Sequence, residues 1–452
     1  MLVTPVALAG VFTVPAVPAA SAVPPPTATV VASAWQAGAA DPGAGLSAPI
    51  AAGPSGGASV PLDQLRGVAL LDRLDSMPRI DVQHFLDAHP GTVNELLAAP
   101  LRANEVAAWW AGAPQVGRGT LRELAPQLVG NLEGVPYEVR DLANRTVLGR
   151  AAQELDARLD GLDGFVGRAE RAELQVQRHM LAQVEDALTE LGAQRALVSL
   201  DTTGEGRAVV VVGDLATADY VDVLVPGMFF GVDAQIAAWT ATAQALVDDQ
   251  EARLRAQGST DTVAAIAWIG YTTPSLLNVA SMELAREGRD ALTATLQGVR
   301  AARGADPPHI AVLAHSYGST AALLALAEED VWVDALAIVG SPGSPARSVE
   351  ELHVADGNVW VGAAEWDPIP ASGVFGSQPL ARGYGARVFA VDAGVDPLTG
   401  EHLDGAVTHN DYFAPGSMSL RNLALIGLGE GGLVTAPGHD HDDVARILTR
   451  IR

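Results

Sequence analysis

The stretch HIAVLAHSYGSTAALLAL, residues 309–326, decides the fold of this chain. Its first part is apolar and predicts a buried β-strand, and the small residues from Gly318 onward predict a helix. Ser316 stands between them. A strand that reverses sharply into a helix pushes the intervening side chain out above the sheet, and small residues are needed two positions before and after it. Gly318 meets this need, and Ala314 adds one methyl group where the motif Gly-x-Ser-x-Gly has its first glycine.

Strands alternate with helices on both sides of this stretch, from Arg195 onward. Two β-rich segments flank residues 203–206 and predict an antiparallel hairpin. Continuous apolar strands and amphipathic helices then alternate, which predicts a mostly parallel, eight-stranded sheet with helices on both faces. The six later strands are expected in DYVDVLVPG, TVAAIAWIGY, HIAVLAHS, VDALAIVGSPG, NVWVGAAEWDP and ARVFAVDAG, with helices around 234–257, 278–300 and 319–327. Reactive groups collect at the carboxyl ends of strands in such sheets.

The chain before Arg195 divides into three parts. Residues 1–22 are apolar and end in Ala-Ser-Ala, which suits signal-peptide cleavage, but no basic residue precedes Arg66. They are either an export signal or a disordered Ala/Pro leader, so the protein is expected outside the cell or in the envelope, with the cytoplasm as the alternative. Residues 23–60 predict a disordered linker. Residues 61–194 predict an all-helical region before an α/β domain at 195–452.

Composition excludes several classes of function. Acidic residues outnumber basic ones 53 to 28, giving a net charge of −25, which argues against nucleic acid or an anionic membrane surface as a partner. Cysteine is absent, which excludes disulfides, thiolate metal sites and a cysteine nucleophile. No segment has the uninterrupted apolar length of a transmembrane helix, because prolines break the leader.

A serine hydroxyl needs a base to become a nucleophile, and the base needs an orienting acid. In this topology the chain order should be Ser, then Asp or Glu, then His, each in a loop after a later strand. Asp367 follows the strand NVWVGAA, and His409 lies in the loop after ARVFAVDAG. We therefore expect Ser316, Asp367 and His409 to form a catalytic triad.

Other acidic and histidine residues fit these roles less well. His315 precedes the serine and is expected to point the other way and to pack beside the turn. His439 and His441 lack a further well-spaced ligand for a metal site, and they predict a solvated helix start. Glu365 is a rival acid, two residues nearer the strand end than Asp367, whereas Asp392 and Asp396 come too late for the usual position of the acid. His402 is in the right loop but in the turn-like context TGEHLDG.

An acyl-transfer site also needs donors for the developing oxyanion. One should be the backbone N–H of Tyr317, at the positive end of the new helix. The other should be the N–H of Met228 in the loop VPGMFFG, where Gly227 lets the backbone turn inward. Three nearby aromatic residues either line an apolar acyl pocket or belong to the core: Phe229, Phe230 and Trp268.

Seven motifs together resemble the α/β-hydrolase superfamily, and more narrowly a bacterial α/β-hydrolase family of unknown function with a helical N-terminal region. They are GNLEGVPYEVRDLANR at 130–145, VDVLVPGM at 221–228, AWIGYTTP at 267–274, AHSYGS at 314–319, VGSPG at 339–343, WDPI at 366–369 and HNDYF at 409–413. The resemblance covers about residues 100–430. It implies that Ser316 is the nucleophile, His409 the base and Asp367 the acid. It implies no metal or organic cofactor.

We expect a serine hydrolase of the carboxylesterase or lipase-like kind, acting on a small-molecule or lipid ester. A peptidase or amidase on the same three residues is the alternative enzyme. The non-catalytic alternative is an exported binding protein that kept the fold, whose helical half would pack against a partner. The net charge of −25 would favour a cationic partner.

Overall fold

The computed structural model describes residues 61–99, 101–162, 167–189, 192–275, 278–328 and 330–438. The leader and linker expected at 1–60, together with His439 and His441, lie outside the described residues. Contacts group the described residues into one compact unit. No helix in the described ranges combines the length and the hydropathy that a bilayer span requires.

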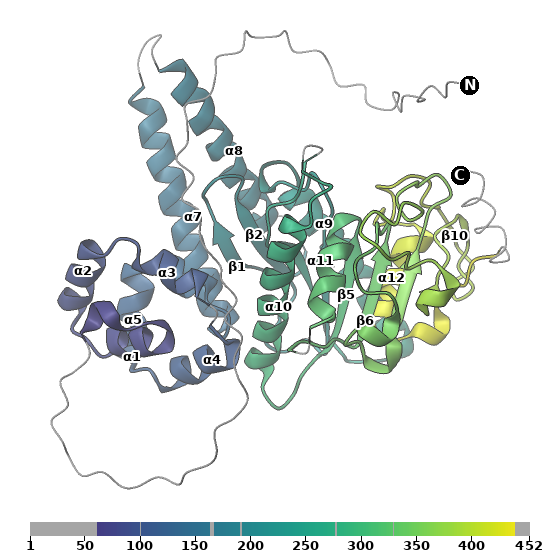
Figure 1. Ribbon diagram of the computed structural model, residues 1–452, viewed down its shortest axis with the longest axis horizontal. Helices are drawn as coiled ribbons and strands as arrows, with labels where there is room; N and C mark the ends of the chain where they lie inside the picture. The colour runs from purple at the N-terminus through teal and green to yellow at the C-terminus, as the bar shows by residue number, and fades with distance from the viewer. Residues whose placement is uncertain are drawn as a thin grey trace, which may run out of the picture. The chain divides into compact units, whose positions relative to one another are not determined.

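An eight-stranded sheet forms the core of the α/β part, with the strand order β1-β2-β4-β3-β5-β6-β7-β8 (Figure 1). The pairs β1–β2 and β2–β4 are antiparallel, and every other neighbouring pair is parallel. This confirms the mostly parallel sheet with an antiparallel edge. The strands are β1 (Arg195–Asp201), β2 (Arg207–Val212), β3 (Tyr220–Val225), β4 (Val263–Ile269), β5 (His309–His315), β6 (Ala335–Val339), β7 (Val359–Gly362) and β8 (Arg387–Val388).

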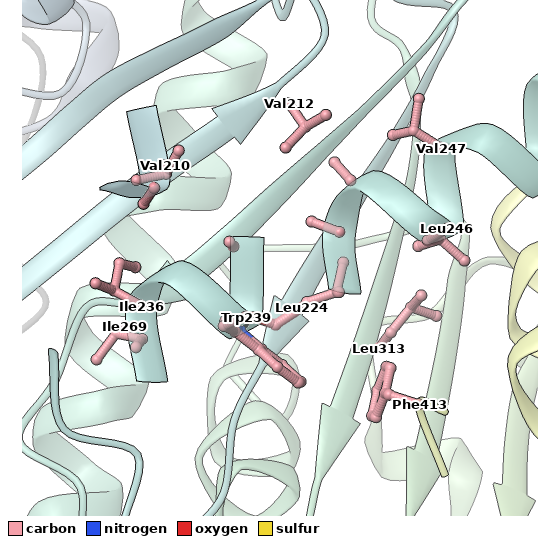
Figure 2. Packing of buried hydrophobic residues seen from close by; sticks show 14 of the residues in the cluster. Val210, Val212, Leu224, Ile236, Trp239, Leu246, Val247, Ile269, Leu313 and Phe413 are labelled. Carbon is pink, nitrogen blue, oxygen red and sulfur yellow. Dashed lines mark hydrogen bonds between the residues drawn. The ribbon is translucent and has the colours of Figure 1, made fainter. Parts of the chain in front are cut away.

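Helices cover both faces of this sheet, because successive residues of a strand point to opposite sides. On one face, α9 (Val232–Gln257) and α12 (Met418–Gly427) pack against alternate strand residues. Figure 2 shows Trp239 of α9 among residues of this cluster that include Leu224 and Leu313. On the other face, α10 (Glu283–Arg303) and α11 (Tyr317–Leu326) pack against the residues in between.

Some boundaries of helices and strands differ from those predicted from the sequence. The helix expected from 278 begins at Glu283, and the helix expected from 319 begins at Tyr317. The last strand is only two residues long, because the chain leaves β7 after Phe389, whose N–H bonds to Val361. Beyond it, the N–H of Ala390 bonds to the carbonyl oxygen of Thr435.

The N-terminal part of the described chain is helical, as expected, and has its own apolar core. Trp109 and Trp110 are buried in that core, and the indole N–H of Trp109 donates to Asp75 at 2.7 Å. The helices are α1 (Gly67–Asp75), α2 (Arg79–Ala88), α3 (Thr92–Ala98), α4 (Ala103–Gly112), α5 (Gln115–Leu124), α6 (Pro126–Asn131), α7 (Tyr137–Asp160) and α8 (Arg168–Thr189).

Side chains of α6 and α7 cover the outer edge of the sheet. β1 has a strand neighbour on one side only, so its outward backbone groups need other partners. Asn131 accepts from the N–H of Leu200 at 2.9 Å and donates to its carbonyl oxygen at 3.0 Å. Asp141 accepts from the N–H of Leu197 at 2.6 Å, and Asn144 donates to the carbonyl oxygen of Leu197 at 3.0 Å. The motif at 130–145 therefore fixes the helical region to the sheet.

The substitution Asn131→Ala tests this edge contact. It leaves the N–H and carbonyl groups of Leu200 without their partner, and a buried polar group left unsatisfied costs about 2 kcal/mol. We expect the free energy of unfolding, measured by urea denaturation, to fall by about that amount. The control is Asn94→Ala, on an exposed position of α3, which should change it by less than about 0.5 kcal/mol. Equal losses in both variants would contradict the edge contact.

Candidate active site

Ser316 stands on a strained turn between β5 and α11. Its backbone has φ 52° and ψ −129°, a conformation that residues with a side chain rarely adopt. Its N–H bonds to the carbonyl oxygen of Val339 in β6 at 2.9 Å, which helps to hold the turn. A Cβ on Gly318 would lie only 2.2 Å from the carbonyl oxygen of Pro226, so this position requires glycine. Ala314 is fully buried within β5.

The structure brings the three predicted residues together. The Oγ of Ser316 lies 2.7 Å from Nε2 of His409, and Nδ1 of His409 lies 2.9 Å from Oδ2 of Asp367. The side chain of Asp367 is fully buried, whereas that of His409 is 23% exposed. The three groups thus form one hydrogen-bonded chain with His409 in the middle, although 93 and 42 positions separate the bonded pairs along the sequence.

Asp367 is buried but well supplied with hydrogen-bond donors. Burial alone would raise the pKa of its carboxyl group. Hydrogen bonds from His409, from the hydroxyl of Tyr412 and from the N–H of Ile369 outweigh burial and lower the pKa below its ordinary value. The carboxylate therefore stays charged beside the imidazole, which is the state that can orient it.

Two residues contact the hydrogen-bonded series of Ser316, His409 and Asp367 in ways that the sequence did not predict. The hydroxyl of Tyr412 donates to Oδ2 of Asp367 at 2.6 Å and accepts from the N–H of Ala364 at 2.8 Å. His315 was expected to point away. Its ring centroid instead lies 4.7 Å from that of His409, and its Nε2 is 2.7 Å from the carbonyl oxygen of His409. Tyr412 belongs to the motif HNDYF, which was the one available signal.

Gly340, directly after β6, makes room for the His409–Asp367 pair. Its φ is +60°, and a Cβ at this position would lie 2.9 Å from Cε1 of His409 and 3.0 Å from Oδ2 of Asp367. Both contacts are too short for a real methyl group. The motif VGSPG contains this glycine, but nothing in its spacing shows which side chains approach it.

The two expected N–H donors are near the serine and unused. A Cβ on Gly227 would lie 2.6 Å from Cβ of Ser316, so the backbone just before Met228 packs on the serine. Tyr317 is the first residue of α11, and its N–H has no partner within the helix. Among the described residues, neither this N–H nor that of Met228 makes a hydrogen bond.

The three aromatic residues near the site have different environments. Trp268 is completely buried, stacks on Tyr271 and donates to Thr295, so it is a core residue and lines no pocket. Phe230 is partly buried, with its ring centroid 5.0 Å from that of Trp239. Phe229 is 51% exposed and has a positive φ of 62°.

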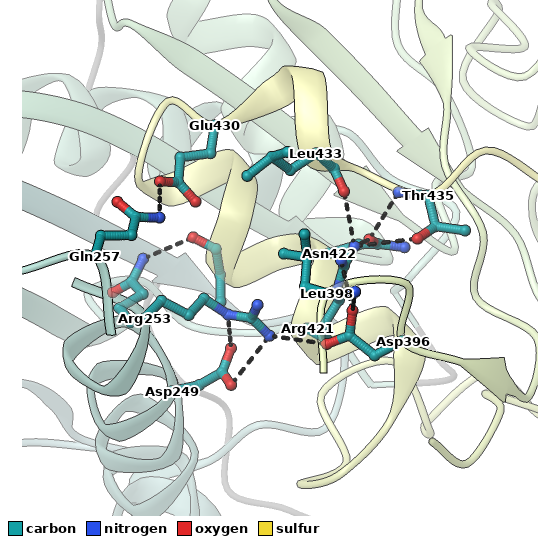
Figure 3. Close-up of polar contacts among 12 residues, drawn as sticks. Asp249, Arg253, Gln257, Asp396, Leu398, Arg421, Asn422, Glu430, Leu433 and Thr435 are labelled. Carbon is teal, nitrogen blue, oxygen red and sulfur yellow. Dashed lines mark hydrogen bonds and ion pairs between the residues drawn. The ribbon is translucent and has the colours of Figure 1, made fainter. Parts of the chain in front are cut away.

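The rival residues lie apart from the hydrogen-bonded chain. Glu365 is exposed, and His402 is exposed in the short strand β10 (His402–Leu403), which pairs with β9 (Gly394–Val395). Asp396 forms a buried ion pair with Arg421 of α12 at 2.8 Å (Figure 3). This pair fixes the segment before His409 to α12. No group of acidic or histidine residues within the described ranges has the arrangement of a metal site.

Comparison with known proteins places this fold in a family. A family model described as "Alpha/beta hydrolase" matches residues 201–376. Uncharacterized protein Rv0963c from Mycobacterium tuberculosis (strain ATCC 25618 / H37Rv) is 31% identical over 195 residues, which cover 41% of this chain and 73% of that protein. Uncharacterized protein Rv2079 from the same strain is 28% identical over 382 residues, which cover 74% of this chain but only 57% of that protein.

A solved structure, the Pyrobaculum calidifontis esterase in its monoclinic form, matches with 13% identity and a TM-score of 0.31. The match covers 66% of this chain and 97% of the esterase. Similarity of this extent says nothing about the activity of this chain. The matching family model and the relative that is 31% identical show the family, and the chain belongs to the α/β hydrolases.

Proposed function

We propose that this protein is a serine hydrolase that cleaves carboxylic esters, with Ser316 as nucleophile, His409 as general base and Asp367 as its orienting acid. One observation carries the proposal: the continuous hydrogen-bonded chain from Ser316 through His409 to Asp367, with distances of 2.7 and 2.9 Å. A protein that had lost catalysis would have no need to keep a strained serine in contact with a histidine, because such strain costs about 1–3 kcal/mol.

In the first half of the proposed reaction, Oγ of Ser316 bonds to the carbonyl carbon of the ester while its proton moves to Nε2 of His409. The buried carboxylate of Asp367 stabilises the imidazolium that forms. The tetrahedral intermediate then loses its alkoxy group, which takes the proton from Nε2 and leaves as an alcohol. Ser316 is left as an acyl ester.

The second half repeats these steps with water. His409 takes a proton from a water molecule as its oxygen bonds to the acyl carbon, and returns the proton to Oγ as the acyl bond to Ser316 breaks. The products are a carboxylic acid and the free serine. In both halves the negative oxygen would accept hydrogen bonds from the N–H groups of Tyr317 and Met228.

Substitution of the nucleophile or the base tests the proposal. Ser316→Ala and His409→Ala should each lower kcat/KM for p-nitrophenyl butyrate about a thousandfold or more, because the residues act as a unit. The matched control is Ser76→Ala, an exposed serine at the end of α1, which should leave turnover unchanged. Ester turnover that persists in Ser316→Ala would rule out this serine. Faster cleavage of peptide anilides than of esters would favour the amidase alternative.

Gly340 offers a test of the space beside His409 and Asp367. Gly340→Ala adds a methyl group that would lie within 3.0 Å of both side chains, so they must shift and the rate should fall about a hundredfold. Gly357→Ala is the matched control, because Gly357 has nearly the same φ (+59°) but no atom within 4 Å of an added Cβ. Both variants share the backbone strain, and only Gly340→Ala should lose most of its activity. Equal activity in the two would contradict the proposed packing.

Tyr412→Phe tests the hydrogen bond that helps to lower the pKa of Asp367. A carboxyl group whose pKa is lowered on folding stabilises the protein above its unfolded pKa of about 3.9, and this contribution disappears as pH falls through the folded pKa. The variant should therefore be less stable than the parent by about 1–2 kcal/mol at pH 7 in urea unfolding. The difference should narrow below about pH 4.

The control for Tyr412→Phe is Tyr384→Phe. Tyr384 is also buried, but its hydroxyl has no hydrogen-bond partner among the residues that the structure describes, so its removal should cost little at any pH. A stability difference between Tyr412→Phe and the parent that is the same at pH 7 and pH 3.5 would mean that the hydroxyl does not act through the charged carboxylate.

A further inference from the structure

Three loops that build the site each carry a large apolar side chain exposed to solvent. Phe229 is 51% exposed, Trp366 72% and Val407 52%. Phe229 follows Met228 directly, Trp366 precedes Asp367 directly, and Val407 lies two positions before His409. Single exposed apolar residues are common on protein surfaces, but several around one site indicate an interaction surface.

Chain connectivity keeps these three residues close to Ser316. The N–H of Trp366 donates to the carbonyl oxygen of Val407 at 3.3 Å, so these two residues are neighbours. The backbone of Gly227 packs directly on Ser316, and Phe229 is two residues further along. Consecutive Cα atoms are about 3.8 Å apart, so each exposed residue lies within two such steps of a residue of the site. We call Phe229, Trp366 and Val407 the apolar rim.

Each side chain of the apolar rim is more than half exposed to solvent. Beneath the site, Trp239 packs edge-on against both Phe230 and Phe413, with centroid distances of 5.0 and 5.1 Å. The buried aromatic residues are thus occupied with each other, whereas the rim has large side chains in contact with water. Such a surface suits a partner that is itself an extended apolar phase, because the rim side chains can then leave water together.

The charge around the apolar rim favours a neutral apolar surface over an anionic one. Segments 226–231, 363–378 and 405–411 contain no arginine or lysine, and Glu365 and Asp411 add negative charge beside Trp366 and Val407. The whole chain carries a net charge of −25. An anionic lipid surface attracts proteins through basic residues and would repel this face. An electrically neutral surface has no such penalty.

We propose that the apolar rim docks the site onto an electrically neutral lipid–water surface, from which an ester reaches Ser316. Trp366 is suited to this role, because an indole ring places its apolar body and its N–H at opposite sides of such a boundary. Docking itself requires no chemistry. That the docked ester is cleaved rests on the proposed serine hydrolase function.

Vesicle binding tests docking separately from catalysis. The full chain carrying Ser316→Ala is mixed with phosphatidylcholine vesicles, and the bound fraction is measured by flotation. Adding Trp366→Ser and Val407→Ser should weaken binding about tenfold or more. The matched control adds Trp332→Ser and Val116→Ser, which removes the same two residue types from exposed positions before β6 and on α5. This control should bind as the parent does, and circular dichroism checks that all variants fold.

Two outcomes of this experiment overturn docking: equal binding by the rim variant and the parent, or tighter binding to phosphatidylglycerol than to phosphatidylcholine vesicles. Residues 1–60 are the same in all variants, so their own affinity for vesicles cannot produce a difference between the variants.

Turnover distinguishes the rim from the catalytic proposal. With Ser316 intact, the rim substitutions should lower the ratio of emulsified tributyrin turnover to soluble p-nitrophenyl butyrate turnover about tenfold, and the matched control should leave that ratio unchanged. An unchanged ratio in the rim variant would contradict the proposed role of the apolar rim in docking. Rim-dependent binding to vesicles by a parent protein that hydrolyses neither ester would support docking while refuting the hydrolase.

Discussion

The positive φ of Ser316 is the constraint on which the site depends. A serine in this conformation can persist only where its surroundings hold it, and the close approach of the loop after β3 does so. Gly318 has no room for a Cβ because the carbonyl oxygen of Pro226 is so near, and Gly227 packs on the serine itself. The hydroxyl of Tyr271 donates to that same carbonyl oxygen at 3.0 Å, which fixes the loop from its other side. The packing of this loop therefore shapes the turn and places the backbone next to Met228 against Ser316.

The charge states of Asp367 and His315 depend on how far hydrogen bonds and nearby charges offset the effect of burial on their pKa values. Asp367 is buried yet stays charged because three donors meet its carboxylate. His315 is also buried, and the attraction of the Asp367 carboxylate offsets that burial only in part. Burial, together with the neighbouring His409, lowers the pKa of His315 to about 4, so its ring is neutral near pH 7. A neutral His315 adds no second positive charge beside the imidazolium that His409 would form, and it can still contact the His409 carbonyl oxygen.

Much of this site can be predicted from the sequence, because the order of the strands and of the loops that follow them can be recognised in it. Ser316, Asp367 and His409 each follow a recognisable strand, and parallel strands bring their carboxyl ends to one edge. Contacts between distant segments leave no such pattern. The approach of Gly340 to His409 and the bond between Tyr412 and Asp367 depend on packing that no spacing reveals. The same is true of Asn131, whose partners in β1 lie 69 positions away.

Covalent labelling is the most direct test of Ser316 as the nucleophile. Intact protein is treated with a fluorophosphonate, and the adduct is located by mass spectrometry of its peptides. We expect one adduct per chain, on Ser316, and a labelling rate that falls sharply in His409→Ala because the base is gone. An adduct on another residue, or undiminished labelling of Ser316 without His409, would contradict the account.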